Sequence, residues 1–68
     1  MKFEYDEEVD AAYIYLKYPI KHGEAKKTIT LNDNIVVDFD QNDKLIGVEI
    51  LNASKVLAEK VLVQAKAT

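Results

Sequence analysis

Apolar positions through the first fifty residues mostly recur at every second residue, which is the spacing of β-strands. The predicted strands are Lys2–Tyr5, Ala11–Leu16, Lys26–Leu31, Ile35–Asp40 and Lys44–Leu51. Ala11–Leu16 is predicted from its richness in tyrosine, isoleucine and leucine instead of from alternation. Short turn-forming runs separate them, such as Asn32 to Asn34. Connections this short join antiparallel strands, whereas parallel crossovers need longer ones. The pattern therefore predicts an antiparallel meander of about five β-strands.

After Leu51 the apolar spacing lengthens to that of an amphipathic helix. Asn52 or Ser54 can cap its start. The apolar stripe of this helix consists of Ala53, Leu57, Val61 and Ala65. We expect one C-terminal α-helix packed on one face of the sheet, which makes residues 1–68 a single domain of the α+β class.

The hairpin from Ile35 to Leu51 has the clearest pattern. Its inward apolar residues are Ile35, Val37 and Phe39 in the first strand and Ile46, Val48 and Ile50 in the second. The register that brings these sets together also places Asp38 and Glu49 on the opposite side. Gly47, inside the second strand, indicates a β-bulge or a close packing contact.

Composition sets the class of protein. A hydrophobic fraction of 49% with 31% charged residues is typical of a folded soluble domain, and the absence of cysteine excludes disulfides and thiolate chemistry. Residues 1–10 are too acidic for a secretion signal, and no apolar run reaches bilayer length. We expect a cytoplasmic protein with no membrane partner.

The charge of the chain argues against nucleic acid as a partner. The net charge is −3, and every basic residue except His22 is lysine, so the forked guanidinium that reads bases is lacking. The one basic cluster surrounds the loop that contains the only proline, and it consists of Lys17, Lys21, His22, Lys26 and Lys27. We interpret it as a solvated loop.

Several motifs together resemble a known family. They are Tyr5-Asp6, Asp10-Ala11-Ala12-Tyr13-Ile14, Val37-Asp38-Phe39-Asp40 and the run from Lys44 to Ser54, KLIGVEILNAS. Up to about Leu57 the chain is similar to small bacterial and archaeal proteins grouped as domain of unknown function 2283. The resemblance implies a stand-alone protein of strands followed by a C-terminal helix, and no established activity. It also suggests pairing with another small protein, as in toxin–antitoxin systems.

Two positions depart from the family pattern. Asp43 stands where the family often has a turn glycine, which leaves the turn type open. Ala58 stands where a proline is common, which allows a longer helix.

A calcium site is one chemical reading of the hairpin. The candidate metal ligands are Asp38, Asp40, Asn42 and Glu49, which match the first, third, fifth and twelfth positions of an EF-hand loop. The sixth position requires glycine and holds Asp43, and the flanking segments are strands instead of helices. These residues therefore predict at most a weak cation site at the hairpin tip.

A second reading makes Asp38 and Glu49 a general acid and base, because two close carboxylates raise one pKa. The alternative is that both lie on a solvated sheet face or accept hydrogen bonds from nearby donors. No catalytic residue is assigned, since His22 stands alone in a loop and no triad can be built. The two isolated glycines offer no phosphate-binding loop, so we expect no cofactor.

A third reading is a protein-binding surface on the second face of the sheet. One helix cannot cover both faces. Val36, Leu45 and Leu51 belong to this face, together with either Tyr13 and Tyr15 or Ile14 and Leu16. We therefore expect a small non-enzymatic interaction module, a homodimer or the partner of another small protein. The alternative is a small enzyme or divalent-cation-binding protein that uses Asp38 and Glu49.

Overall fold

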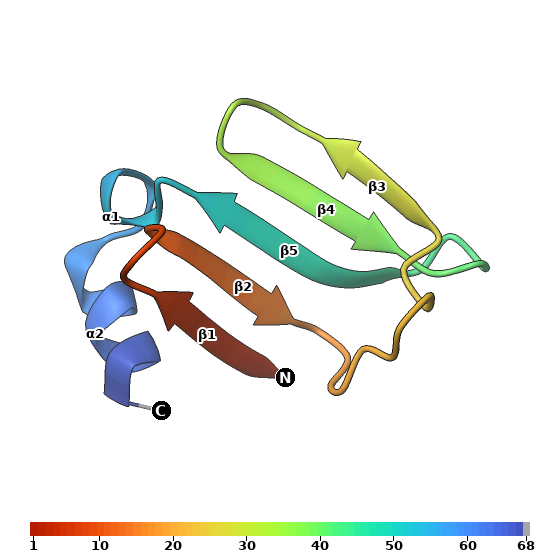
Figure 1. Ribbon diagram of the computed structural model, residues 1–68, viewed down its shortest axis with the longest axis horizontal. Coiled ribbons are helices and arrows are strands. Elements are labelled where there is room, and N and C mark those ends of the chain that lie inside the picture. The colour runs from red at the N-terminus through yellow and green to blue at the C-terminus, as the bar shows by residue number, and fades with distance from the viewer. Residues whose placement is uncertain (68) are drawn as a thin grey trace.

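The computed structural model describes residues 1–67, and the side chains up to Gln64. Five strands form one antiparallel sheet, and two short helices follow (Figure 1). The strands are β1 Lys2–Asp6, β2 Ala11–Tyr15, β3 Lys27–Thr30, β4 Ile35–Phe39 and β5 Leu45–Leu51. The helices are α1 Ala53–Val56 and α2 Glu59–Ala67. This arrangement confirms the predicted α+β class and the antiparallel pairing of the strands.

The order across the sheet is β1-β2-β5-β4-β3. The hairpin β1–β2 therefore lies beside the three-stranded meander β3–β4–β5, and the last strand occupies the centre. The segment after β2 crosses the width of the sheet to reach β3, which becomes an outer edge (Figure 1). The central strand has a neighbouring strand on each side, so its inward apolar side chains are the most buried. Ile46 and Ile50 of β5 are 3% and 5% exposed.

The hairpin register agrees with the sequence pattern. Val37 lies opposite Val48, and Ile35 lies opposite Ile50. The ladder then slips by one residue, because Asp38 pairs with Gly47 whereas Phe39 pairs with Leu45. Ile46 is the extra residue, so the bulge predicted at Gly47 lies directly beside it.

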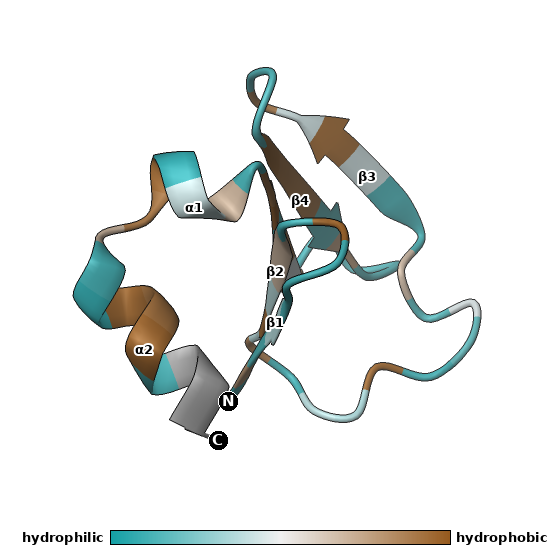
Figure 2. Ribbon diagram, turned by 60° about the vertical axis from the view of Figure 1, so that its left-hand side comes forward, coloured by the Kyte–Doolittle hydropathy of each residue, from teal (hydrophilic) through white to brown (hydrophobic). Residues whose placement is uncertain are grey.

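Both helices cover the same face of the sheet (Figure 2). The centre of this packing is Ala53 of α1, which is fully buried between Ala12 and Ile50. Around these three pack half-buried apolar residues from the sheet and from the C-terminal segment, and they are Phe3, Tyr5, Ile14, Val48, Leu57 and Leu62. We call the face of the sheet beneath the two helices the covered face, and the other face the open face.

The helical C-terminal segment is divided into two short helices, where the sequence predicted one. Leu57 ends α1 in an extended conformation, with φ −94° and ψ 145°. This break lets Leu57 reach the core cluster and turns α2 toward β1. Apolar contact therefore outweighs the helix propensity of Ala58. The side chain of Ala65, the last member of the predicted stripe, lies outside the described residues.

Asn52 occupies the expected N-cap position of α1, but its side chain does not cap the helix. Asn52 precedes α1 in the left-handed region, with φ 55°, and its side chain makes no cap hydrogen bond. Asp10, in the turn between β1 and β2, replaces it. Its carboxylate accepts hydrogen bonds from the Ser54 amide at 3.0 Å and from the Ser54 hydroxyl at 2.7 Å.

Candidate functional site

The open face carries two rows of side chains that run straight across the five strands. The first row is Lys2, Tyr15, Gly47, Asp38 and Thr28, and the second is Glu4, Tyr13, Glu49, Val36 and Thr30. Residues paired directly across neighbouring strands share a face, so the register alone fixes both rows. The register therefore places Tyr13 and Tyr15 on the open face, whereas the sequence left Ile14 and Leu16 as the alternative.

Asp38 is the centre of a hydrogen-bond network on this face. The Tyr13 hydroxyl donates to Asp38 Oδ2 at 2.6 Å, and the Thr28 hydroxyl donates to Asp38 Oδ1 at 2.6 Å. Burial raises the pKa of Tyr13, and its hydrogen bond to the Asp38 carboxylate raises it further. The two donors come from β2 and β3, so one carboxylate on β4 connects strands on both sides of it.

Gly47 makes this network possible. The Tyr13 ring extends diagonally over β5, and a Cβ added to Gly47 would lie 2.0 Å from Tyr13 Oη and 2.6 Å from Cζ. Only a residue without a side chain leaves this space free. The predicted close packing contact at Gly47 is therefore confirmed.

Tyrosine rings continue the open face from Tyr13 toward the end of β2. Tyr13 and Tyr15 lie with ring centroids 4.6 Å apart, and Tyr18 meets Tyr15 edge-on at 5.1 Å. Lys2 Nζ lies 4.4 Å from the centre of the Tyr18 ring. A hydrogen bond with Glu4, together with burial, raises the pKa of Tyr15. The three tyrosines thus form an aromatic cluster whose polar neighbours are Lys2 and Glu4.

Asp38 and Glu49 lie on the same face, as the hairpin register requires. They are diagonal neighbours, because Val36 lies directly opposite Glu49. Both oxygens of Asp38 accept hydroxyl hydrogen bonds, whereas the Glu49 carboxylate accepts none from the side chains described up to Gln64. The arrangement gives Asp38 a hydrogen-bonded partner on each side of β4.

The four predicted metal ligands do not converge. Asp40 instead stabilises the hairpin tip, since its Oδ1 accepts the amides of Asn42 at 2.8 Å and Lys44 at 3.0 Å. Asp43 takes a left-handed conformation with φ 59°, which settles the turn geometry without glycine. Over the part of the chain that the structure describes, no three acidic or histidine side chains come close enough to hold a metal ion.

The bulge in β5 separates Leu45 from the other four residues of the predicted interaction face. Tyr13, Tyr15, Val36 and Leu51 follow the open-face alternation. Leu45 lies opposite Phe39, one position out of step, and the ladder places it with the covered face. This pairing differs from the regular alternation expected for Leu45, because the slip at Ile46 reverses it, and the Leu45 side chain is 43% exposed.

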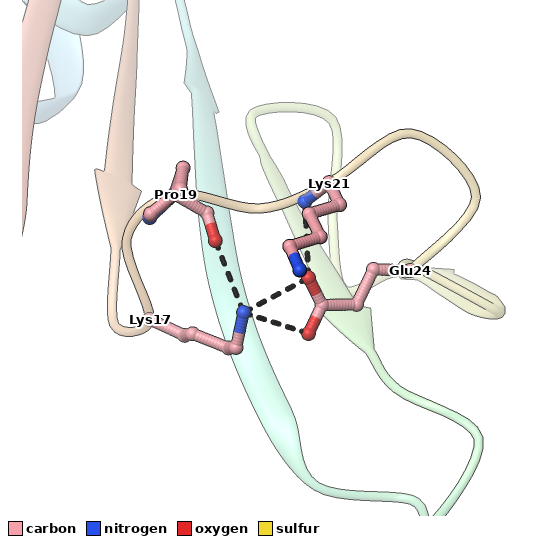
Figure 3. A network of polar contacts seen from close by, with 4 residues as sticks. All are labelled: Lys17, Pro19, Lys21 and Glu24. Carbon is pink, nitrogen blue, oxygen red and sulfur yellow. Dashed lines mark hydrogen bonds and ion pairs between the residues drawn. The ribbon is translucent and has the colours of Figure 1, made fainter.

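The basic loop is partly neutralised by an acidic residue (Figure 3). Lys17 Nζ lies 2.8 Å from Glu24 Oε2 and donates to the Pro19 carbonyl at 3.0 Å. Lys17 and the Lys21 amide lower the pKa of Glu24. Further along, Lys27 lies 3.8 Å from Asp43. These pairs favour the reading of the cluster as a solvated loop.

Two features were missed in the sequence. The first is Asp10, whose Oδ1 also accepts the Tyr5 hydroxyl at 2.6 Å and whose role joins the first hairpin to α1. The second is Thr28, which supplies half of the donors around Asp38. The alternation of Thr28 and Thr30 with apolar residues was the available signal for Thr28. Asp10 belongs to one of the family motifs, but its role could not be predicted from spacing, because its partner Ser54 lies forty-four positions away.

Comparison with known proteins shows the family of this chain. The family model described as Protein of unknown function (DUF2283) matches residues 2–54. An uncharacterized protein of Methanocaldococcus jannaschii is 46% identical over 56 residues, which cover 81% of this chain and 43% of that protein. The chain thus spans less than half the length of that relative. No solved structure matches it. Within residues 1–67, neither helix is long and apolar enough to cross a membrane. The chain belongs to the DUF2283 family of proteins of unknown function.

Proposed function

We propose that the protein is a small non-enzymatic interaction module that associates with a second copy of itself. The observation that carries this proposal is how little apolar surface the folded chain buries. Five apolar residues are buried in residues 1–64, and none is larger than isoleucine; they are Ala12, Val37, Ile46, Ile50 and Ala53. No aromatic side chain is among them. A domain of this size gains from a partner, because its own core is small.

Exposed apolar side chains on the sheet support the same proposal. Ile29 and Leu31 are 36% and 62% exposed, and Leu51 is 37% exposed. Single exposed apolar residues are ordinary, but Leu51 lies on the open face, and Ile29 and Leu31 lie at the β3 edge, which neither helix contacts. Self-association would shelter such residues and offset the small core.

A non-enzymatic role agrees with the geometry of the carboxylates. Asp38 is held by two hydroxyl donors, and Glu49 is its diagonal neighbour on the same face. Proton exchange at Asp38 would break its hydrogen bond with Tyr13 or with Thr28, so this carboxylate is poorly placed to act as a general acid or base.

Sedimentation equilibrium of the purified chain, from low to high micromolar concentration, tests the proposal. We expect an average mass that rises toward twice that of one chain. A strictly monomeric mass at high micromolar concentration would contradict self-association. In that case, affinity capture from the native cell decides whether a different small protein takes the place of the second copy.

A further inference from the structure

Strand β3 is an edge strand with nothing beyond it in the described chain. It forms one end of the sheet order (Figure 1), and its four residues are all exposed. Its sequence, Lys-Thr-Ile-Thr, is β-branched over three positions and contains no proline. A strand of this kind presents unpaired main-chain groups and is a template for another strand. The opposite edge, β1, is contacted by α2.

The hydrogen bonds to β4 determine which groups of β3 point outward. The Leu31 amide donates to the Ile35 carbonyl at 2.8 Å, so Leu31 belongs to the hydrogen-bonded positions. These positions alternate in an antiparallel pair, and Ile29 therefore also bonds to β4. The amide and carbonyl groups of Thr28 and Thr30 consequently point away from the sheet.

We infer that β3 pairs with β3 of a second copy, antiparallel, about a two-fold axis at Ile29. This inference rests on the proposed self-association and names its surface. Thr28 of one copy would face Thr30 of the other, and both would exchange main-chain hydrogen bonds across the axis. The two five-stranded sheets would join into one continuous sheet of ten strands.

Side chains and charges fit this register. On the open side, threonine faces threonine, and on the covered side Ile29 faces its own copy, pairs that stabilise antiparallel strands. Lys27 faces Leu31, so like charges do not meet. The basic start of one strand, at Lys26, lies beside the end of the other, which continues to Asp33. A parallel pairing would instead place the lysines of the two copies together.

The helices leave this edge free. They pack on β5 and β1, whereas β3 lies at the far side of the sheet (Figure 1). In the dimer they would lie at the two outer ends of the long sheet. The pairing therefore needs no rearrangement of the chain.

Two substitutions that act on the outer edge test the inference. Thr30→Pro removes the outward amide while the bonds of Ile29 and Leu31 to β4 stay, and edge strands tolerate proline in that orientation. Ile29→Lys places two positive charges on the axis. We expect each variant to weaken self-association at least about tenfold, measured by sedimentation. Thr30→Val keeps the amide and serves as the matched control, which should associate like wild type.

The absence of native cysteine allows a positive test as well. Residues that face each other at a non-hydrogen-bonded pair have Cα atoms about 4.5 Å apart, within the range of a disulfide. We expect Ile29→Cys to form a covalent dimer rapidly under mild oxidation, whereas Val63→Cys on α2 should not.

The outcomes separate the two claims. If the wild type is monomeric at every concentration, the proposed function fails. If the wild type dimerises, but Thr30→Pro and Ile29→Lys dimerise equally well and Ile29→Cys does not cross-link, self-association stands and the β3 edge is overturned. Circular dichroism shows that each variant is folded, and the cross-linking result stands even if one of the disruptive variants unfolds.

Discussion

Tyr13 and Asp38 are joined by a 2.6 Å hydrogen bond that passes over the strand between them. Tyr13 lies on β2 and Asp38 on β4, while β5 separates the two strands. The contact is possible because β5 has Gly47 beneath the tyrosine ring. One hydrogen bond therefore ties the first hairpin to the meander on the face that no helix covers.

Gly47→Ala should destabilise the fold by about 1–3 kcal/mol, because the new methyl group forces Tyr13 to move and give up its bond to Asp38. Urea denaturation measures this change. The matched control is the same substitution in a Tyr13→Ala background, where we expect the cost to fall close to zero. Equal costs in both backgrounds would show that Tyr13 does not determine the need for glycine.

Asp38→Ala should cost about 1–3 kcal/mol in the free energy of unfolding, since the Tyr13 and Thr28 hydroxyls lose their acceptor. Asp38→Asn keeps one acceptor oxygen and should cost less. Glu49→Gln, on the same face, should be nearly neutral. A larger loss of stability for Glu49→Gln than for Asp38→Ala would contradict the structural role assigned to Asp38.

The Tyr5–Asp10–Ser54 cluster predicts how stability depends on pH. Hydrogen bonds from Ser54 and Tyr5 lower the pKa of Asp10, so its contribution is complete above the usual carboxyl pKa and is lost as pH falls through the lower folded value. Hydrogen bonding to Asp10 raises the pKa of Tyr5 to about 12, so that contribution is present below pH 10 and is lost as pH rises toward 12.

Thermal unfolding across the pH range measures both losses, with Asp10→Asn and Tyr5→Phe as controls. The acid loss should be smaller in Asp10→Asn, and the alkaline loss should be smaller in Tyr5→Phe. Ultraviolet titration should show Tyr5 ionising only above pH 11. Ionisation of Tyr5 near pH 10 would mean that its bond to Asp10 is absent in solution.

Divalent cations should leave the melting temperature unchanged, because Asp38 and Asp40 already accept hydrogen bonds from separate parts of the hairpin. Thermal unfolding in millimolar calcium, magnesium or manganese tests this expectation, since a ligand of the native state raises the melting temperature. An increase that disappears in Glu49→Gln would revive the cation site.

The alternation of apolar residues was sufficient to predict the strands, and the register of the last hairpin followed from pairing Val37 with Val48. The shared face of Asp38 and Glu49 was predicted for the same reason, because the side-chain period of a strand is two. Gly47 was predictable as a special position, since glycine in a strand interior weakens it without a compensating contact.

The remaining features depend on contacts between distant segments. Leu57 interrupts the helix because its side chain packs on the core cluster, and helix propensity does not depend on such a distant contact. Asp10 caps α1 from another turn, which no spacing rule within the helix can predict. Leu45 changes face because the bulge adds Ile46 to one strand, and a regular alternation cannot show where a strand slips.

Hydrogen exchange at the amides of Thr28 and Thr30 is the most direct test of pairing through the β3 edge. Both amides point outward in a single chain and would be bonded in the proposed dimer. We predict slow exchange at high protein concentration and fast exchange on dilution, while the Ile29 amide stays protected throughout. Fast exchange of Thr28 and Thr30 in a sample that sedimentation shows to be dimeric would contradict the account.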